Sequence, residues 1–278
     1  MRLVIFYIFI TIPIFAQKFN ISFIAYIDNS WKIVVCDDNF KCTTKSTLQE
    51  PRTYDYNFND NSLIYIGSDK NLRFVKDNNE TVLIKVDKNA YTQPSFIDNN
   101  NIILVELINR NSKKTRIIKL NLSSKKITFL HTQNATSLDP YLNKDKLYYA
   151  NVSCVEGCGK IIQEIWNKDL ITNISNQLTL KNSISYQPVA TLDNKFIYFS
   201  SMDRDGYHIW RYSNKLKDIK QITFGDVIDQ FPAIYKGNIM FIREIKDSYK
   251  LLYYKDGKLI KIPLPKKYQK IRNLKVSK

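Results

Sequence analysis

Short apolar runs separated by Asn- and Asp-rich turns recur along the whole chain. The runs are rich in β-branched and aromatic side chains, and few place apolar residues at the i, i+3, i+4 spacing of an amphipathic helix. Asn and Asp tolerate left-handed turn positions, so the low content of 7 glycines does not argue against strands. The pattern predicts an all-β protein, and its clearest strands are 63–66, 102–105, 147–150, 196–199 and 239–242.

These five runs each follow a similar approach segment that is anchored by a proline, or by a tyrosine in the first case. The anchors are Tyr56, Pro94, Pro140, Pro188 and Pro232, with steps of 38, 46, 48 and 44 residues. A period of about 40 to 45 residues with four short strands per unit is typical of β-propeller blades. Residues 17–278 have room for six units of about 44 residues, which predicts a six-bladed β-propeller of four-stranded antiparallel blades.

The segment 183–241 carries the most specific motifs. Ser201-Met-Asp-Arg-Asp-Gly206 forms a hairpin, Gln221-Ile-Thr-Phe224 closes an outer strand, and Asp229-Gln-Phe-Pro232 opens the next unit. These elements resemble the WD40-like repeat of TolB-type six-bladed β-propellers. The resemblance implies a single propeller domain over residues 17–278. No segment is left for the N-terminal domain that precedes the propeller in full TolB proteins, so we expect a lone TolB-like propeller.

The two ends of the predicted domain complement each other. The segment 20–26 aligns with the second strand of a blade and has no proline approach before it. The segment 268–276 can supply the missing innermost strand, and this pairing would close the ring and remove a free sheet edge. A disordered basic tail is the alternative interpretation of the C-terminus.

The N-terminus has the features of a secretory signal peptide. Arg2 precedes a largely apolar run from Leu3 to Phe15, which is too short to span a membrane, and Ala16-Gln17 offers a cleavage site. We expect residues 1–16 to be removed and residues 17–278 to be periplasmic or secreted. An uncleaved anchor and a buried first strand are the alternatives.

Four cysteines form two close pairs, Cys36 with Cys42 and Cys154 with Cys158. An even number of cysteines in an exported chain predicts disulfides, although four cysteines permit three pairings. Each close pair brackets a polar turn, so local bridges across hairpin ends are the simplest choice. A zinc site built from all four is the alternative.

The chain has 42 Lys+Arg and 26 Asp+Glu, a formal net charge of +16. Only nine of the basic residues are arginine, the side chain best suited to bidentate reading of phosphate, so a nucleic-acid partner is not expected. The lysines are spread over the chain, with a basic concentration after residue 265. We expect at most weak contact with anionic envelope surfaces.

The motifs of common enzymes are absent from the sequence. It holds two histidines, His131 and His208, and no nucleophile-elbow, zinc-protease or phosphate-loop pattern. Asp203 and Asp205 are explained by the hairpin turn without a bound ion. No catalytic residue, cofactor or metal is therefore predicted.

A propeller presents the loops that enter its inner strands around a central channel, and polar loop residues on a rigid scaffold often form binding sites. Capping of neighbouring turns is the alternative role for each of them. The predicted rim residues are Thr92, Asp139, Tyr186, Gln187, Asp229 and Gln230.

We therefore expect a monomeric, non-catalytic scaffold that binds an envelope protein. The TolB resemblance implies a partner such as a peptidoglycan-associated lipoprotein. The alternatives are a glycoside-active enzyme with Asp139 and Asp229 as acid and base, about 5 to 10 Å apart, and a sugar-binding lectin with aromatic pockets between blades.

Overall fold

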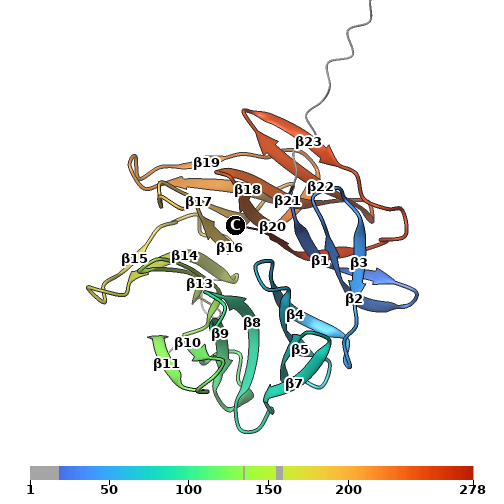
Figure 1. Cartoon of the computed structure of the whole chain (residues 1–278). Coiled ribbons are helices and arrows are strands. Elements are labelled where there is room, and N and C mark those ends of the chain that lie inside the picture. Colours follow the sequence, from blue (N-terminus) through green and yellow to red (C-terminus); the bar gives the residue numbers. More distant parts are fainter. Residues whose placement is uncertain (1–18, 134, 155–158, 278) are drawn as a thin grey trace, which may run out of the picture.

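The computed structural model describes residues 19–133, 135–154 and 159–277, and these residues form a β-propeller (Figure 1). Within this part of the chain, 24 strands are accompanied by one short 3₁₀ helix, η1 (Ile108–Arg110), which confirms the predicted all-β class. No helix among the described residues is long and apolar enough to cross a membrane. The predicted signal peptide, residues 1–16, and the predicted bridge to Cys158 fall outside the described residues.

The strands form four sheets of four strands and one larger sheet. The first sheet has the order β24 (Ile271–Val276), β1 (Ile21–Ile27), β2 (Ser30–Cys36), β3 (Cys42–Lys45). The second contains β4 (Pro51–Asn57), β5 (Ser62–Gly67), β6 (Leu72–Lys76) and β7 (Asn79–Ile84). The third contains β8 (Ala90–Phe96), β9 (Asn101–Leu107), β10 (Thr115–Asn121) and β11 (Ile127–Thr132). The fourth contains β12 (Ser137–Asn143), β13 (Lys146–Cys154), β14 (Ile162–Asp169) and β15 (Ser175–Gln177).

The larger sheet of eight strands consists of two antiparallel sets. One set is β16 (Ser185–Ala190), β17 (Phe196–Asp203), β18 (Gly206–Ser213) and β19 (Ile219–Gln221). The other is β20 (Val227–Tyr235), β21 (Asn238–Ile245), β22 (Ser248–Lys255) and β23 (Lys258–Ile262). Two parallel residue pairs, Gly206 with Val227 and Tyr207 with Ile228, join the sets.

Both faces of these four-strand sets are buried against neighbouring sets. Successive residues of a strand point to opposite faces. On β5, Ile64 packs in a cluster with Phe96 of the third sheet, whereas Tyr65 packs in a cluster with Ile33 of the first. Six such apolar clusters lie between consecutive sets, including one that joins the last set to β1 and β24. The core is therefore divided among the interfaces between sets.

The two ends of the chain meet in the first sheet. β1 occupies the second position, and β24 pairs with it in antiparallel register, with Ser22 opposite Lys275 and Ala25 opposite Ile271. Tyr268, just before β24, lies edge-on to the ring of Phe23 at 5.4 Å between centroids. The most C-terminal described segment is thus an ordered strand, which excludes a disordered tail over residues 271–276.

One predicted disulfide falls within the described residues. Cys36 and Cys42 are register partners on β2 and β3, and their sulfur atoms are bonded at 2.03 Å. The predicted local bridge between these two cysteines is therefore confirmed. It links the neighbouring strands β2 and β3, which lie farthest from β24 in the first sheet.

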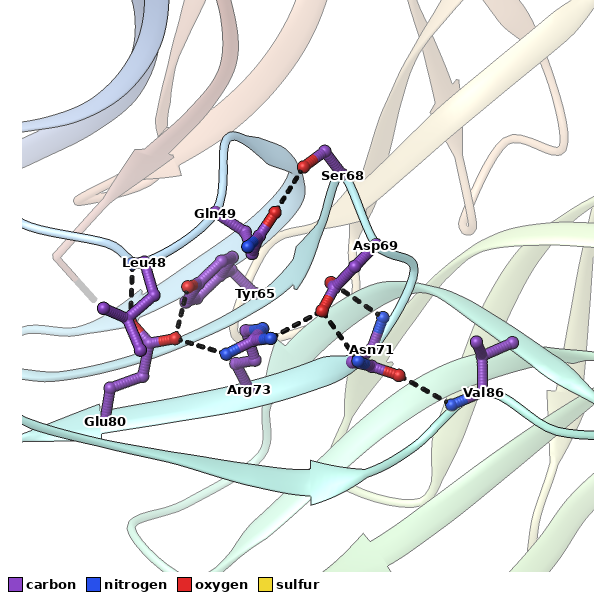
Figure 2. Close-up of polar contacts among 9 residues, drawn as sticks. All are labelled: Leu48, Gln49, Tyr65, Ser68, Asp69, Asn71, Arg73, Glu80 and Val86. Carbon is purple, nitrogen blue, oxygen red and sulfur yellow. Dashed lines mark hydrogen bonds and ion pairs between the residues drawn. The ribbon is translucent and has the colours of Figure 1, made fainter.

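A buried ionic network fixes the second sheet to the segment that leads into it (Figure 2). Arg73 on β6 donates to Glu80 on β7 at 2.8 Å and to Asp69 at 2.5 Å. Glu80 also accepts from the Tyr65 hydroxyl at 2.7 Å and from the backbone N–H of Leu48 at 2.9 Å. Because Arg73 is only 8% exposed, its charge depends on both carboxylates for compensation.

Deleting residues 268–278 should strongly destabilise the protein, because it removes β24 and leaves the edge of β1 unpaired. The buried side chains of Tyr268, Ile271 and Leu274 would be lost, each contributing about 1.5–3 kcal/mol. We expect the melting temperature to fall by about 10 °C or more in calorimetry.

The control for this deletion replaces the exposed Lys266 and Lys267 by serine and should leave the melting temperature nearly unchanged. A deletion that melts like the intact chain would contradict a stabilising role for β24.

Candidate functional site

The inner strands β4, β8, β12, β16, β20 and β24 surround a central channel (Figure 1). Two adjoining cavities of about 220 and 170 Å³ lie along it. Both are lined by Tyr141, Val189 and Lys275, so they are parts of one channel. Each strand set contributes its first strand to this channel, with β24 serving that role for the first sheet.

Four inner strands share a β-bulge at the residue that precedes proline. These residues are Gln93, Asp139, Gln187 and Phe231, with φ between 51° and 56°. The left-handed conformation costs a non-glycine residue roughly 1–2 kcal/mol, so it needs compensating contacts. A bulge also releases the residue's N–H from the ladder of its own sheet.

The released N–H groups bond to side chains of the preceding strand set. Gln93 N–H donates to Thr53 Oγ1 at 3.1 Å, and Asp139 N–H donates to Gln93 Oε1 at 2.8 Å. Gln187 N–H donates to Asp139 Oδ2 at 3.2 Å, and Phe231 N–H donates to Gln187 Oε1 at 2.7 Å. We call Thr53, Gln93, Asp139, Gln187 and Phe231 the girdle. Its hydrogen bonds, each contributing about 0.5–1.5 kcal/mol, offset the cost of the left-handed backbone.

Asp139 is the ionisable member of the girdle. Its side chain is partly exposed, but only to the channel, and its other oxygen, Oδ1, accepts from Gln93 Nε2 at 2.5 Å. Desolvation inside the protein raises the pKa of Asp139 to about 6. The N–H of Gln187 and the charge of Lys275 act in the opposite direction and limit the rise in this pKa.

A second carboxylate, Asp55, lies deeper in the channel. One of its oxygens accepts from Ser95 Oγ at 3.0 Å and from the N–H of Phe96 at 2.7 Å. The other lies 3.5 Å from the ammonium of Lys275. The side chain of Lys275 is 31% exposed, and Lys275 lines both cavities of the channel.

The predicted rim residues divide into two groups. Asp139 and Gln187 line the channel and are bonded to each other through the girdle. Thr92 is adjacent to Gln93, and Tyr186 packs edge-on against Tyr207 at 5.3 Å between centroids. Burial raises the pKa of Tyr186, while a hydrogen bond with Gln230 lowers it. None of Thr92, Tyr186 and Gln230 is among the residues that line the two cavities.

Asp229 does not belong to the accessible rim. It is completely buried, and its two oxygens accept from Arg243 Nε and Nη2, both at 2.7 Å. Asp229 and Arg243 are register partners on β20 and β21, so this ion pair stabilises a sheet. A contact role for Asp229, as expected from the sequence, would require breaking a buried bidentate pair.

The sequence interpretation missed Gln93, Thr53, Phe231 and Lys275. Gln93 and Phe231 directly precede a proline, as Asp139 and Gln187 do, so the repeated X-Pro position was the available signal. Thr53 is followed by Tyr54, where the other girdle residues are followed by a proline. The first anchor predicted from the sequence, Tyr56, lies two residues beyond this position. Among the described residues, no group of three His, Cys, Asp or Glu side chains is arranged to hold a metal ion.

Comparison with solved structures shows the fold. The chain is similar to TolB from Acinetobacter baumannii, with a TM-score of 0.74 and 13% identity over 93% of this chain and 66% of that one. It is also similar to a putative TolB from Agrobacterium tumefaciens, with a TM-score of 0.65 and 12% identity over 88% of each chain. An oligogalacturonate lyase from Vibrio parahaemolyticus has a TM-score of 0.62 and 11% identity, over 89% of this chain and 76% of that one. The sequence matches no protein-family model and no curated protein.

These likenesses define the class of the protein as a β-propeller with TolB propellers among its structural neighbours. Identities this low carry the fold and not the activity. The chemistry of the channel must therefore support any functional conclusion.

Replacing Asp139 by asparagine should remove a component of the pH dependence of stability. A carboxyl group with a folded pKa of about 6 and an ordinary unfolded pKa of 3.8 binds more protons when folded, so its contribution to stability falls as pH rises from about 4 to 6. Relative to Asp139→Asn, the wild-type free energy of unfolding should drop by about 2–3 kcal/mol across this window, as measured by urea denaturation.

The control is Asp205→Asn, which removes one carboxylate at the exposed hairpin between β17 and β18 and so measures the effect of losing a charge outside the channel. Parallel profiles for wild type and Asp139→Asn would show that Asp139 titrates normally.

Proposed function

We propose that this protein is an exported, non-catalytic six-bladed propeller that binds a protein partner of the cell envelope at its channel. The observation that carries the proposal is the channel itself. It is lined by side chains of the inner strands from all strand sets, and the girdle holds them in fixed positions. A cavity lined by both polar and apolar side chains on a rigid scaffold suits recognition of an extended segment of another protein.

The count of six blades rests on treating the larger sheet as two blades. Each of its sets has four antiparallel strands, as the other sheets do. The parallel bridge between them occurs where Gly206, with φ of 137°, lets its backbone approach the carbonyl oxygen of Val227, which a Cβ would contact. On this count β24 closes the ring by completing the first blade.

The absence of catalysis is supported by how the channel carboxylates are used. Both oxygens of Asp139 accept hydrogen bonds from the girdle, and Asp55 is held by Ser95 and Lys275. An enzyme acting on a glycoside needs an acid and a base that are free to exchange protons with the substrate. Asp229 is buried and paired with Arg243, so a glycoside-active enzyme would need another carboxylate to act with Asp139 as its acid or base. The lectin alternative requires aromatic pockets between blades, and the channel does not test it.

Location outside the cytoplasm is supported by the Cys36–Cys42 disulfide, because such bonds persist mainly in oxidising compartments. It agrees with the secretory signal expected at the N-terminus. The partner would then be an envelope protein, and the TolB-like propeller fold makes a peptidoglycan-associated lipoprotein the first class to examine.

Affinity capture from intact envelopes tests the proposed channel site. The bait is the chain from residue 17, with the variant Lys275→Met, which removes the ammonium and keeps the apolar stem. Recovery of the partner should fall by about tenfold, corresponding to about 1.4 kcal/mol.

Lys215→Met, in an exposed turn on the outside of the protein, is the matched control and should capture as wild type does. Equal capture by Lys275→Met, with an unchanged melting curve, would place the partner elsewhere, and capture of no specific protein would refute the binding function.

A further inference from the structure

The girdle passes from one strand set to the next until it reaches Phe231. At each earlier step, an oxygen-bearing side chain of one set accepts the bulge N–H of the following set. The phenyl group of Phe231 has no oxygen or nitrogen. The next set therefore receives no acceptor from this position, and the series of hydrogen bonds ends between β20 and β24.

The residue that follows in the series is Asn273 on β24. It shares the left-handed backbone of the girdle residues, with φ of 55°, and it lies in a bulge between Arg272 and Lys275. Its side chain is directed toward the second sheet, where Nδ2 contacts the carbonyl oxygen of Arg52 at 3.4 Å. By equivalence with Gln93, Asp139 and Gln187, its backbone N–H is released from its own ladder toward the position of Phe231.

Phe231 and Asn273 line the same cavity of about 170 Å³, together with Lys275 and Asp139. The place between them is thus accessible from the channel. The groups that fill the equivalent places are the hydroxyl of Thr53, the amide oxygens of Gln93 and Gln187, and the carboxylate of Asp139. The fold itself therefore indicates which chemistry fits: a side-chain oxygen acceptor on a short stem.

The charges around the cavity distinguish an amide from a carboxylate. Asp55 and Asp139 are acidic and Lys275 is the facing cation, so an added carboxylate would meet an unfavourable balance while Asp139 is ionised. A neutral carboxamide avoids this repulsion, and its stem can lie against the ring of Phe231. Gln93 and Gln187 already use an amide oxygen as the acceptor at their places in the girdle.

We propose that the place between Phe231 and Asn273 is a binding site for the side-chain carboxamide of a glutamine or asparagine in an extended peptide, whose oxygen accepts from Asn273 N–H. This site lies in the channel and rests on the proposed function, since it names the group that the partner would insert. The ligand supplies, between β20 and β24, the oxygen acceptor that the side chain of Phe231 lacks.

The first test uses NMR titration of the Asn273 amide in the chain from residue 17. The probe is N-acetyl-glycyl-glutaminyl-glycine N-methylamide, whose only primary carboxamide is the glutamine side chain, compared with its glutamyl counterpart of nearly the same shape. At pH 7 the glutamine peptide should shift the Asn273 amide, and the glutamate peptide should bind about tenfold more weakly. This difference should shrink below pH 6, where Asp139 becomes neutral. Equal binding of the two peptides at pH 7, or no shift with glutamine, would overturn the proposal.

The second test fills the site from the protein side. Phe231→Gln supplies the missing oxygen, so it should abolish peptide binding, slow hydrogen exchange of the Asn273 amide and raise the melting temperature relative to Phe231→Leu. Phe231→Leu adds no acceptor and should retain binding. Phe231→Thr, which supplies the same hydroxyl acceptor as Thr53, is the second acceptor variant if the glutamine variant does not fold. The proposal is wrong if the acceptor and leucine variants bind the peptide alike.

Propionamide separates the two sources of a carboxamide. It should bind far more weakly than the peptide, and equal affinity would contradict a peptide ligand in favour of a free small amide. These measurements use purified components only. They can fail while envelope capture succeeds, or succeed while capture fails, so the two proposals are tested separately.

Discussion

Every strand set in this protein is apolar on both faces, and that constraint determines the rest of its architecture. A set with Ile64 directed to one side and Tyr65 to the other needs a neighbour on each side to bury both. An open row of sets would leave one apolar face exposed at each end. Here one face of β1 is buried in a cluster that it shares with β24 and the last set. The inner strands then converge on a common axis. There the strands meet around a channel with a mixed polar and apolar lining, and hydrogen bonds connect adjacent sets directly.

The girdle is the solution to this problem at the axis. A regular inner strand would direct all its N–H groups into its own sheet and leave adjacent sets without a direct link. The bulge at the X-Pro position turns one N–H outward, and a Gln or Asp at the same position of the preceding set receives it. Gln93, Asp139 and Gln187 thus each donate and accept, whereas Phe231 only donates. These hydrogen bonds explain why non-glycine residues keep a strained left-handed backbone at four successive positions.

The spacing of the proline anchors was sufficient to predict the strands and their repeat, because strand length and turn composition are local properties. The Cys36–Cys42 bridge was predictable for the same reason. Asp139 and Gln187, which both precede a proline, line the channel. Asp229 is instead paired with Arg243, a cross-strand partner that the repeat does not reveal. Thr53 was hidden because a tyrosine follows it, where a proline follows Gln93, Asp139 and Gln187, and its role as an acceptor appears only when Gln93 is placed beside it.

The fold alone does not decide between binding and catalysis, since a TolB and an oligogalacturonate lyase are both structural neighbours of this chain. The use of Asp139 bears directly on the question. To act as a general base it would have to give up acceptor positions that hold Gln93 and the N–H of Gln187, and so loosen two contacts between strand sets. Its raised pKa of about 6 arises from burial within that structural role and does not by itself indicate proton transfer. A group that the architecture needs as an acceptor is poorly suited to repeated protonation, and this favours a channel that recognises a ligand without transforming it.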